Sequence, residues 1–183
     1  LRGRWGLRRL VTGLAMNRFV RILKHRWLDE TDTRRALGDA ALDRLAARVR
    51  SSEQRHHGEI RICVEAGLPL SYLWRGLRAR DRAITLFGKL RVWDTEANNG
   101  VLIYVLLAEH AIEIVCDRAA ARQVPQGHWD TLVARLGEAF RAGRFEAGLA
   151  EAVDAVDALL AQHFPAATGA ANPNELPDRP LRG

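Results

Sequence analysis

The sequence predicts an α/β domain that is built around a small mixed β-sheet. Residues 60–65 alternate between branched apolar side chains and other side chains, a period of two that is typical of a strand. Residues 101–107 form a continuous apolar run, which indicates a strand that is buried on both faces. Stretches with helical spacing of apolar residues precede, separate and follow these runs, so we expect helices to cover the sheet.

The order of these elements predicts the topology of the sheet. A helix predicted over residues 71–88 lies between the two strands, which makes a βαβ unit with parallel strands and a right-handed crossover. Residues 108–111 form a tight turn, so the strand predicted over residues 112–116 should pair antiparallel with the preceding one.

Helical periodicity and composition divide the rest of the chain. A basic amphipathic helix is expected over residues 17–28 and a second helix over 33–55, while apolar stripes predict two closing helices over 129–142 and 145–164. Four of the six prolines fall after residue 164, where no apolar stripe continues. We therefore expect a basic N-terminal segment over residues 1–30, an α/β domain over 31–164 and a disordered tail over 165–183.

The positive charge is concentrated at the start of the chain. The net charge of the 183 residues is +6, yet residues 1–28 hold eight of the 28 basic residues and no acid. The remainder is slightly acidic, so we expect no nucleic-acid partner. No apolar run is long enough for a transmembrane helix.

The helix predicted over residues 17–28 leaves two interpretations open. Its apolar face includes Phe19, Ile22, Leu23 and Trp27, and basic residues occupy much of the rest. Such a helix can bind an anionic membrane, or it can dock on its own domain through the same face. The start site is Leu1 or Met16, and the hypothesis for Met16 makes residues 1–15 an over-long gene assignment or an unprocessed remnant. The location is expected to be cytoplasmic, at the membrane periphery.

The cysteines indicate a reducing compartment. Cys63 and Cys116 lie inside apolar strand-like runs and have no neighbouring cysteine at metal-binding spacing. We expect two buried, free thiols.

The topology brings polar residues from three distant segments to one edge of the sheet. The starts of the first two strands and the end of the third should meet there. Carboxylate and amide oxygens suit hard cations, which predicts a site for Ca²⁺ or Mg²⁺. The candidate metal ligands are Asp94, Glu96, Asn98, Asn99 and Asp117. The same edge holds His56, His57, Glu59 and Arg118.

A structural role is the alternative for several of these residues. Asp94 can cap a turn, Asn98 and Asn99 can hold left-handed conformations, and Asp117 can cap a following helix. The spacing resembles the beginning of an EF-hand loop but fails further on, because Val105 stands where a glutamate is required. Neighbouring residues of a helix diverge, so His56 and His57 are expected at a solvated helix end rather than as a chelating pair.

The sequence from Leu90 to His110, with its N-G-V-L-I core, followed by I-E-I-V and by Asp117 and Arg118, resembles the TPM domain family. That family includes the thylakoid acid phosphatase and photosystem II repair proteins of plants. The resemblance spans about residues 33–164 and is to the short bacterial form without signal peptide or membrane anchor. It implies a three-layer α/β/α sandwich, divalent-metal binding or acid phosphatase activity in some relatives, and site roles for Asp94, Asn98, Asn99 and Asp117.

Two functions follow as hypotheses. The first is an accessory module that binds an unknown protein partner at a membrane-associated complex, with a divalent metal. The second is a metal-assisted acid phosphatase that hydrolyses phosphomonoesters, for which Asp94, Asp117 and Arg118 are the catalytic candidates. The sequence holds no nucleophile elbow, P-loop or dinucleotide-binding glycine motif.

Overall fold

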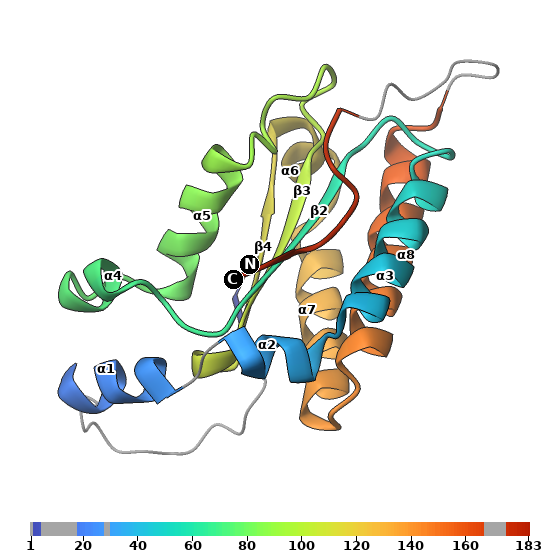
Figure 1. Cartoon of the computed structure of the whole chain (residues 1–183). Helices are drawn as coiled ribbons and strands as arrows, with labels where there is room; N and C mark the ends of the chain where they lie inside the picture. Colours follow the sequence, from blue (N-terminus) through green and yellow to red (C-terminus); the bar gives the residue numbers. More distant parts are fainter. Residues whose placement is uncertain (1, 5–17, 28–29, 167–174) are drawn as a thin grey trace.

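A mixed five-stranded sheet with the order β1-β4-β3-β2-β5 forms the centre of the molecule (Figure 1). The computed structural model describes residues 2–4, 18–27, 30–166 and 175–183. The strands are β1 (Arg2–Arg4), β2 (Ile60–Glu65), β3 (Val101–Leu106), β4 (Ala111–Cys116) and β5 (Leu181–Arg182). The helices are α1 (Arg18–Trp27), α2 (Glu30–Ala36), α3 (Asp39–Ser52), α4 (Leu70–Trp74), α5 (Ala79–Lys89), α6 (Arg118–Gln123), α7 (Gln126–Arg141) and α8 (Phe145–His163).

The predicted βαβ unit and hairpin are both confirmed. β2 pairs parallel with β3, with Ile60 opposite Val101, and β3 pairs antiparallel with β4, with Val101 opposite Cys116. The connection between β3 and β4 is a short 3-10 turn that ends at His110, whose φ of 49° is left-handed.

Two layers of helices cover the sheet and give the three-layer α/β/α sandwich (Figure 1). Alternate residues of β3 point to opposite faces: Val101, Ile103 and Val105 join a core with α3, α7 and α8. Leu102, Tyr104 and Leu106 join a second core with α5. Every residue of β3 is fully buried, as the continuous apolar run predicted.

A buried polar network binds α5 to the sheet. The hydroxyl of Tyr104 donates to Glu65 at 2.8 Å, and the Arg82 guanidinium on α5 donates to the same carboxylate at 2.9 Å. Burial raises the pKa of the Tyr104 hydroxyl, which therefore stays protonated and serves as a donor.

Two predicted helices are each divided in two. The helix expected over 33–55 is α2 followed by α3, and Gly38 in an extended conformation separates them. The helix expected over 71–88 is α4 followed by α5, and the chain turns at Gly76, whose φ is +69°. Glycine adopts this left-handed conformation without the strain that a Cβ atom brings, so the break falls there. The sequence predicted no bounds for the short helix α6, but Asp117 caps it, which is the structural role offered for this residue.

The expectation of a disordered tail is wrong for residues 175–183. β5 pairs parallel with β2, and the backbone N–H of Gly183 donates to Val64. Leu176 is buried in the same core as Tyr104. Composition failed here because a two-residue strand that pairs with a distant partner has no periodicity of its own. Residues 167–174, and the start expected at Met16, lie outside the described residues.

Both cysteines are free, as expected, and burial raises the pKa of each thiol to about 12. Within the described ranges, no helix combines the length and apolarity that crossing a membrane requires.

The loop before β3 depends on close packing at Gly100. A Cβ atom at this position would lie 2.0 Å from the carbonyl oxygen of Val92, which cannot move aside without displacing the buried Val92.

We expect Gly100→Ala to lower the free energy of unfolding by about 2 kcal/mol or more, measured by urea denaturation. Gly88→Ala is the matched control, because nothing lies within 4 Å of its Cβ position. The control should be neutral or slightly stabilising, and an equal loss in both variants would contradict this account.

Candidate functional site

Three chain segments meet at the end of the sheet where β2 and β3 begin and β4 ends. We call this the sheet corner, and it comprises Gly58–Glu59, Asn98–Gly100 and Asp117–Arg118. The backbone N–H of Val101 donates to Glu59 at 2.9 Å, and that of Asp117 donates to Gly100 at 2.8 Å. The corner therefore joins residues that are nearly sixty positions apart in the chain.

The loop over residues 91–100 positions Asn99 inside the corner. Asn98 has a left-handed φ of 53°, and its carbonyl accepts from Ala119 at 2.9 Å. The Thr95 hydroxyl accepts from the backbone N–H of Asn99 at 3.2 Å. These contacts turn the Asn99 side chain into the protein, where its exposed fraction is 0%.

The corner contains buried polar atoms without partners among the described residues. Both Oδ1 and Nδ2 of Asn99 are buried and accept or donate no hydrogen bond there. Asp117 uses Oδ1 to cap α6, accepting from Arg118 N at 2.6 Å, whereas its buried Oδ2 has no partner. An unsatisfied buried polar group costs about 1–3 kcal/mol, so this arrangement favours a ligand that completes it.

Asp94 and Glu96 lie apart from these atoms. The Asp94 carboxylate is about half exposed and lies 3.9 Å from the Arg91 guanidinium. Glu96 is exposed, and its backbone N–H donates to Glu175 at 3.0 Å. The five candidate ligands therefore do not converge, and in the described parts of the chain no group of three His, Cys, Asp or Glu residues has metal-binding geometry. The oxygens that fit a hard cation are those of Asn99 and Asp117.

Arg118 lies on the solvent side of the corner. Together with Asn98 and Arg122 it lines a shallow pocket of about 260 Å³, completed by Ala97 and Ala119. Two guanidinium groups one helical turn apart can hold an oxyanion such as phosphate.

Glu59 was expected at this edge, but the buried acidic residues Glu53 and Asp178 beside it were not predicted. The Glu59 carboxylate accepts from the backbone N–H groups of Glu175 and Leu176 at 3.1 and 3.2 Å. Glu53 accepts from Ile60 N at 3.2 Å, and Asp178 pairs with Arg50 at 2.8 Å. Burial, together with the negative charges of Glu59 and Asp178, raises the pKa of Glu53 to about 8. The contacts of Glu59 and Asp178 attach residues 175–183 to the rest of the domain. Because residues 165–183 were expected to be disordered, the burial of these acidic groups could not be predicted.

His56 is not at a solvated helix end, and that prediction is wrong. Its exposed fraction is 0%, its Nδ1 accepts from Gly58 N at 3.1 Å, and its Nε2 lies 3.5 Å from Asp157. Burial lowers the pKa of His56 to about 4. The imidazole is therefore a neutral part of the core at neutral pH, and only His57 is partly exposed.

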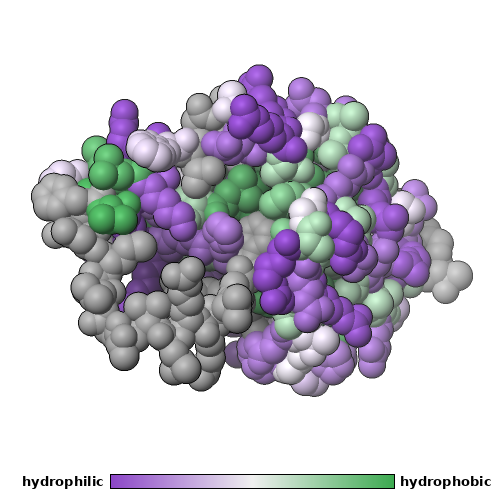
Figure 2. Space-filling model, turned by 90° about the horizontal axis from the view of Figure 1, so that it is seen from below, coloured by the Kyte–Doolittle hydropathy of each residue, from purple (hydrophilic) through white to green (hydrophobic). Residues whose placement is uncertain are grey.

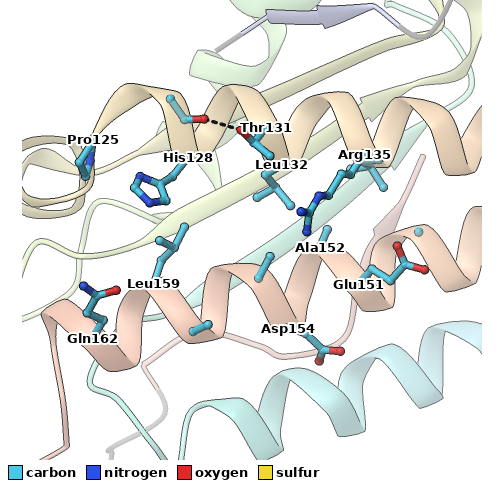
Figure 3. A pocket seen from close by; sticks show the side chains of 15 residues that line it. Pro125, His128, Thr131, Leu132, Arg135, Glu151, Ala152, Asp154, Leu159 and Gln162 are labelled. Atoms are coloured by element: carbon cyan, nitrogen blue, oxygen red, sulfur yellow. Dashed lines mark hydrogen bonds between the residues drawn. The ribbon is translucent and has the colours of Figure 1, made fainter.

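A larger groove lies between α7 and α8, away from the sheet corner (Figure 3). Its volume is about 800 Å³, and Leu132, Ala152 and Leu159 form its apolar floor. His128 and Arg135 on α7 face Glu151 and Gln162 on α8 across it. None of the candidate metal ligands lines this groove, so the groove is not part of the candidate cation site.

The sequence profile of the TPM domain matches residues 31–159. The chain belongs to the TPM domain family. This confirms the family that the motifs around residues 90–118 indicated, and it covers the sheet corner together with both helical layers.

Solved structures agree with this assignment. The solution structure of BA42 from the psychrophilic bacterium Bizionia argentinensis is 27% identical over 80% of this chain and 95% of its own, with a TM-score of 0.70. The N-terminal domain of a protein from P. gingivalis shares the fold at 20% identity and a TM-score of 0.57, covering 70% of this chain and 80% of its own. No curated protein matches the sequence significantly.

The raised pKa of Glu53 makes the stability of the TPM domain depend on pH. Because the folded state holds this proton more tightly than the unfolded state, the stabilisation is complete below about pH 4.5 and is lost as pH rises through about 8. The free energy of unfolding of the unsubstituted protein should decrease between pH 5 and pH 8. We expect this decrease to be smaller by roughly 2–4 kcal/mol in Glu53→Gln. Urea denaturation at both pH values measures it.

Glu138→Gln is the control, because Glu138 is exposed on α7. It should leave the pH dependence unchanged. A decrease of the same size in Glu53→Gln and in the unsubstituted protein would contradict the assignment of this proton to Glu53.

Proposed function

We propose that this TPM domain is an accessory binding module that holds a divalent cation, Ca²⁺ or Mg²⁺, at the sheet corner. The observation that carries the proposal is a pair of buried oxygens, Asn99 Oδ1 and Asp117 Oδ2, which have no hydrogen-bond partner in the described part of the chain. Both oxygens are hard ligands, and a cation beside them would neutralise the buried carboxylate. Water and backbone carbonyls can supply the remaining ligands, which suits a low-affinity site.

The module is further proposed to act with a protein partner at a membrane-associated complex. The cation would stabilise the loop over residues 91–100 against the end of β4, because one ligand comes from each. Asn98 and Arg118 lie on the accessible side of that junction and would then offer a fixed surface to the partner. Cation occupancy would in this way control the shape of the recognition surface.

A titration with Ca²⁺ and with Mg²⁺, followed by NMR at the amides of residues 94–100 and 117–119, tests the cation site. We expect saturable shifts at these amides and at least a tenfold loss of affinity in Asp117→Asn. This substitution removes the charge while keeping the oxygen that caps α6, so the fold is retained.

Asp94→Asn is the matched control for the same loop. The Asp94 carboxylate faces Arg91 on the surface. The cation affinity of the Asp94→Asn variant should therefore stay within a factor of two of that of the unsubstituted protein. Absence of shifts at 10 mM cation, or an equal loss of affinity in both variants, would refute the proposed ligands.

A phosphomonoester hydrolase is the second candidate, favoured by the pocket that Arg118 and Arg122 line beside the corner. A cation held there would supply Lewis-acid polarisation of a phosphoryl oxygen. The protein's own contribution would be to bind the phosphate through the two guanidinium groups and to hold the buried Asp117 carboxylate next to it.

Hydrolysis of p-nitrophenyl phosphate in the presence of Mg²⁺ measures this activity. We expect Arg118→Ala combined with Arg122→Ala to lower kcat/KM at least tenfold, and Asp117→Asn to lower kcat. Arg135→Ala, an exposed arginine on α7, should have no effect. Activity that survives both the paired arginine substitution and Asp117→Asn would eliminate this candidate.

A further inference from the structure

Within the described residues, α1 contacts the domain through the face that carries Arg21 and His25. Arg21 donates to Glu109 at 2.7 Å and to the Leu77 carbonyl at 2.7 Å, and His25 lies 3.1 Å from the same glutamate. The His25 Nδ1 also accepts from Leu68 N at 2.9 Å. These contacts fix the orientation of α1 against α4 and the turn after β3, so the opposite face of α1 has a defined direction.

That opposite face is apolar, and the neighbouring α4 also exposes apolar side chains. The most exposed side chain is Trp27 at 84%, followed by Leu23 at 57% and Val20 at 52%. On α4, Trp74 is 54% exposed and Leu70 is 47% exposed. Seen from below, hydrophobic atoms gather at the left of the molecule, over α1 and α4 (Figure 2). We call these five residues the α1–α4 surface.

The helices that carry the α1–α4 surface are mainly positive, although Asp81 beyond α4 accepts from the Arg78 backbone and Glu109 pairs with Arg21. Residues 18–27 contain four arginine or lysine residues and no acid, and residues 69–80 contain three arginines and no acid. Lys24 and Arg26 on α1, and Arg75 and Arg78 just after α4, are exposed to solvent. The domain as a whole is slightly acidic after residue 28, which makes this local excess distinct.

We propose that the α1–α4 surface docks on an anionic lipid bilayer. Tryptophan side chains favour the boundary between headgroups and acyl chains, and leucine and valine favour the region just below it. Lysine and arginine beside them are attracted to anionic headgroups. A folded pair of short helices with two exposed tryptophans and a mainly cationic sequence matches this interface in both respects.

The proposed membrane contact is separate from the sheet corner. Glu109, which holds α1, follows the end of β3, whereas Asn99 precedes its start. The two sites therefore lie at opposite ends of the same strand. The lipid surface deepens the proposal of a role at a membrane-associated complex, and it does not require the cation site.

Flotation of the full chain with vesicles tests this surface. One set of vesicles is phosphatidylcholine alone, and the other contains 30% phosphatidylglycerol; EDTA is present throughout, so that no cation bridges protein and lipid. We expect at least fivefold more protein with the anionic vesicles at 100 mM NaCl. That preference should fall in 500 mM NaCl, as screened electrostatic attraction does.

Two pairs of substitutions separate the apolar and ionic contributions. Trp27→Ser with Trp74→Ser should reduce binding to anionic vesicles at least fivefold, and Lys24→Glu with Arg26→Glu should abolish the preference for them. Trp93→Ser with Lys89→Glu is the control, because these exposed residues lie near the sheet corner. Thermal unfolding of each variant confirms that the fold is retained, as expected for exposed positions.

Equal partitioning with neutral and anionic vesicles, or an equal loss in the control pair, would overturn the proposal. Light scattering after size exclusion identifies the competing occupant. A dimer that dissociates in the tryptophan pair, without any vesicle binding, would assign the surface to a second copy of the chain and also overturn it. The NMR titration measures cation binding without lipid, and the flotation experiment measures lipid binding without free cation. Failure of one proposal therefore does not decide the other.

Discussion

The burial of β3 on both faces is the constraint on which the rest of the structure depends. Each residue of this strand places its side chain in one of two cores, so both helical layers must form for the strand to leave water. Its neighbours β2 and β4 satisfy its backbone, and they too are almost entirely buried. The position of the sheet corner follows directly, because the residues just before β3 and just after β4 are held wherever this central strand is held.

The central part of the fold could be predicted because its strands and helices each show a clear local periodicity of apolar residues. The alternation at Ile60–Glu65, the apolar run from Val101 and the stripe from Trp129 to Phe140 each contain enough residues to identify the element. Where single residues decide the outcome, the pattern was insufficient. Gly38 and Gly76 divide helices whose apolar spacing continues across the break. His56 is buried because the C-terminal end of α8 packs over it, and nothing near it in the sequence indicates that contact.

The candidate site, too, could be predicted only in part from the sequence. Topology correctly brings Asn99 and Asp117 to one corner, since the ends of paired strands must coincide. It does not determine which way a loop side chain turns: Thr95 and Asn98 direct Asn99 inward, while Asp94 and Glu96 remain at the surface. Glu59 was placed at this edge, but its burial, and the roles of Glu53 and Asp178, were missed. Their environment is created by residues 175–183, which lie more than a hundred positions away from Glu53 and Glu59 in the chain.

The short terminal strands have a consequence for the behaviour of this domain among many copies of itself. β1 covers the open edge of β4, and β5 with Gly183 covers that of β2, where Ala66 N also donates to the Gly183 carbonyl. An uncovered strand edge offers a row of unsatisfied donors and acceptors to any other chain. β1 and the segment Leu181–Gly183 thus protect these edges from strand-to-strand aggregation. The positions that matter most for the colloidal behaviour of the protein are therefore these two short segments rather than the long strands that they cover.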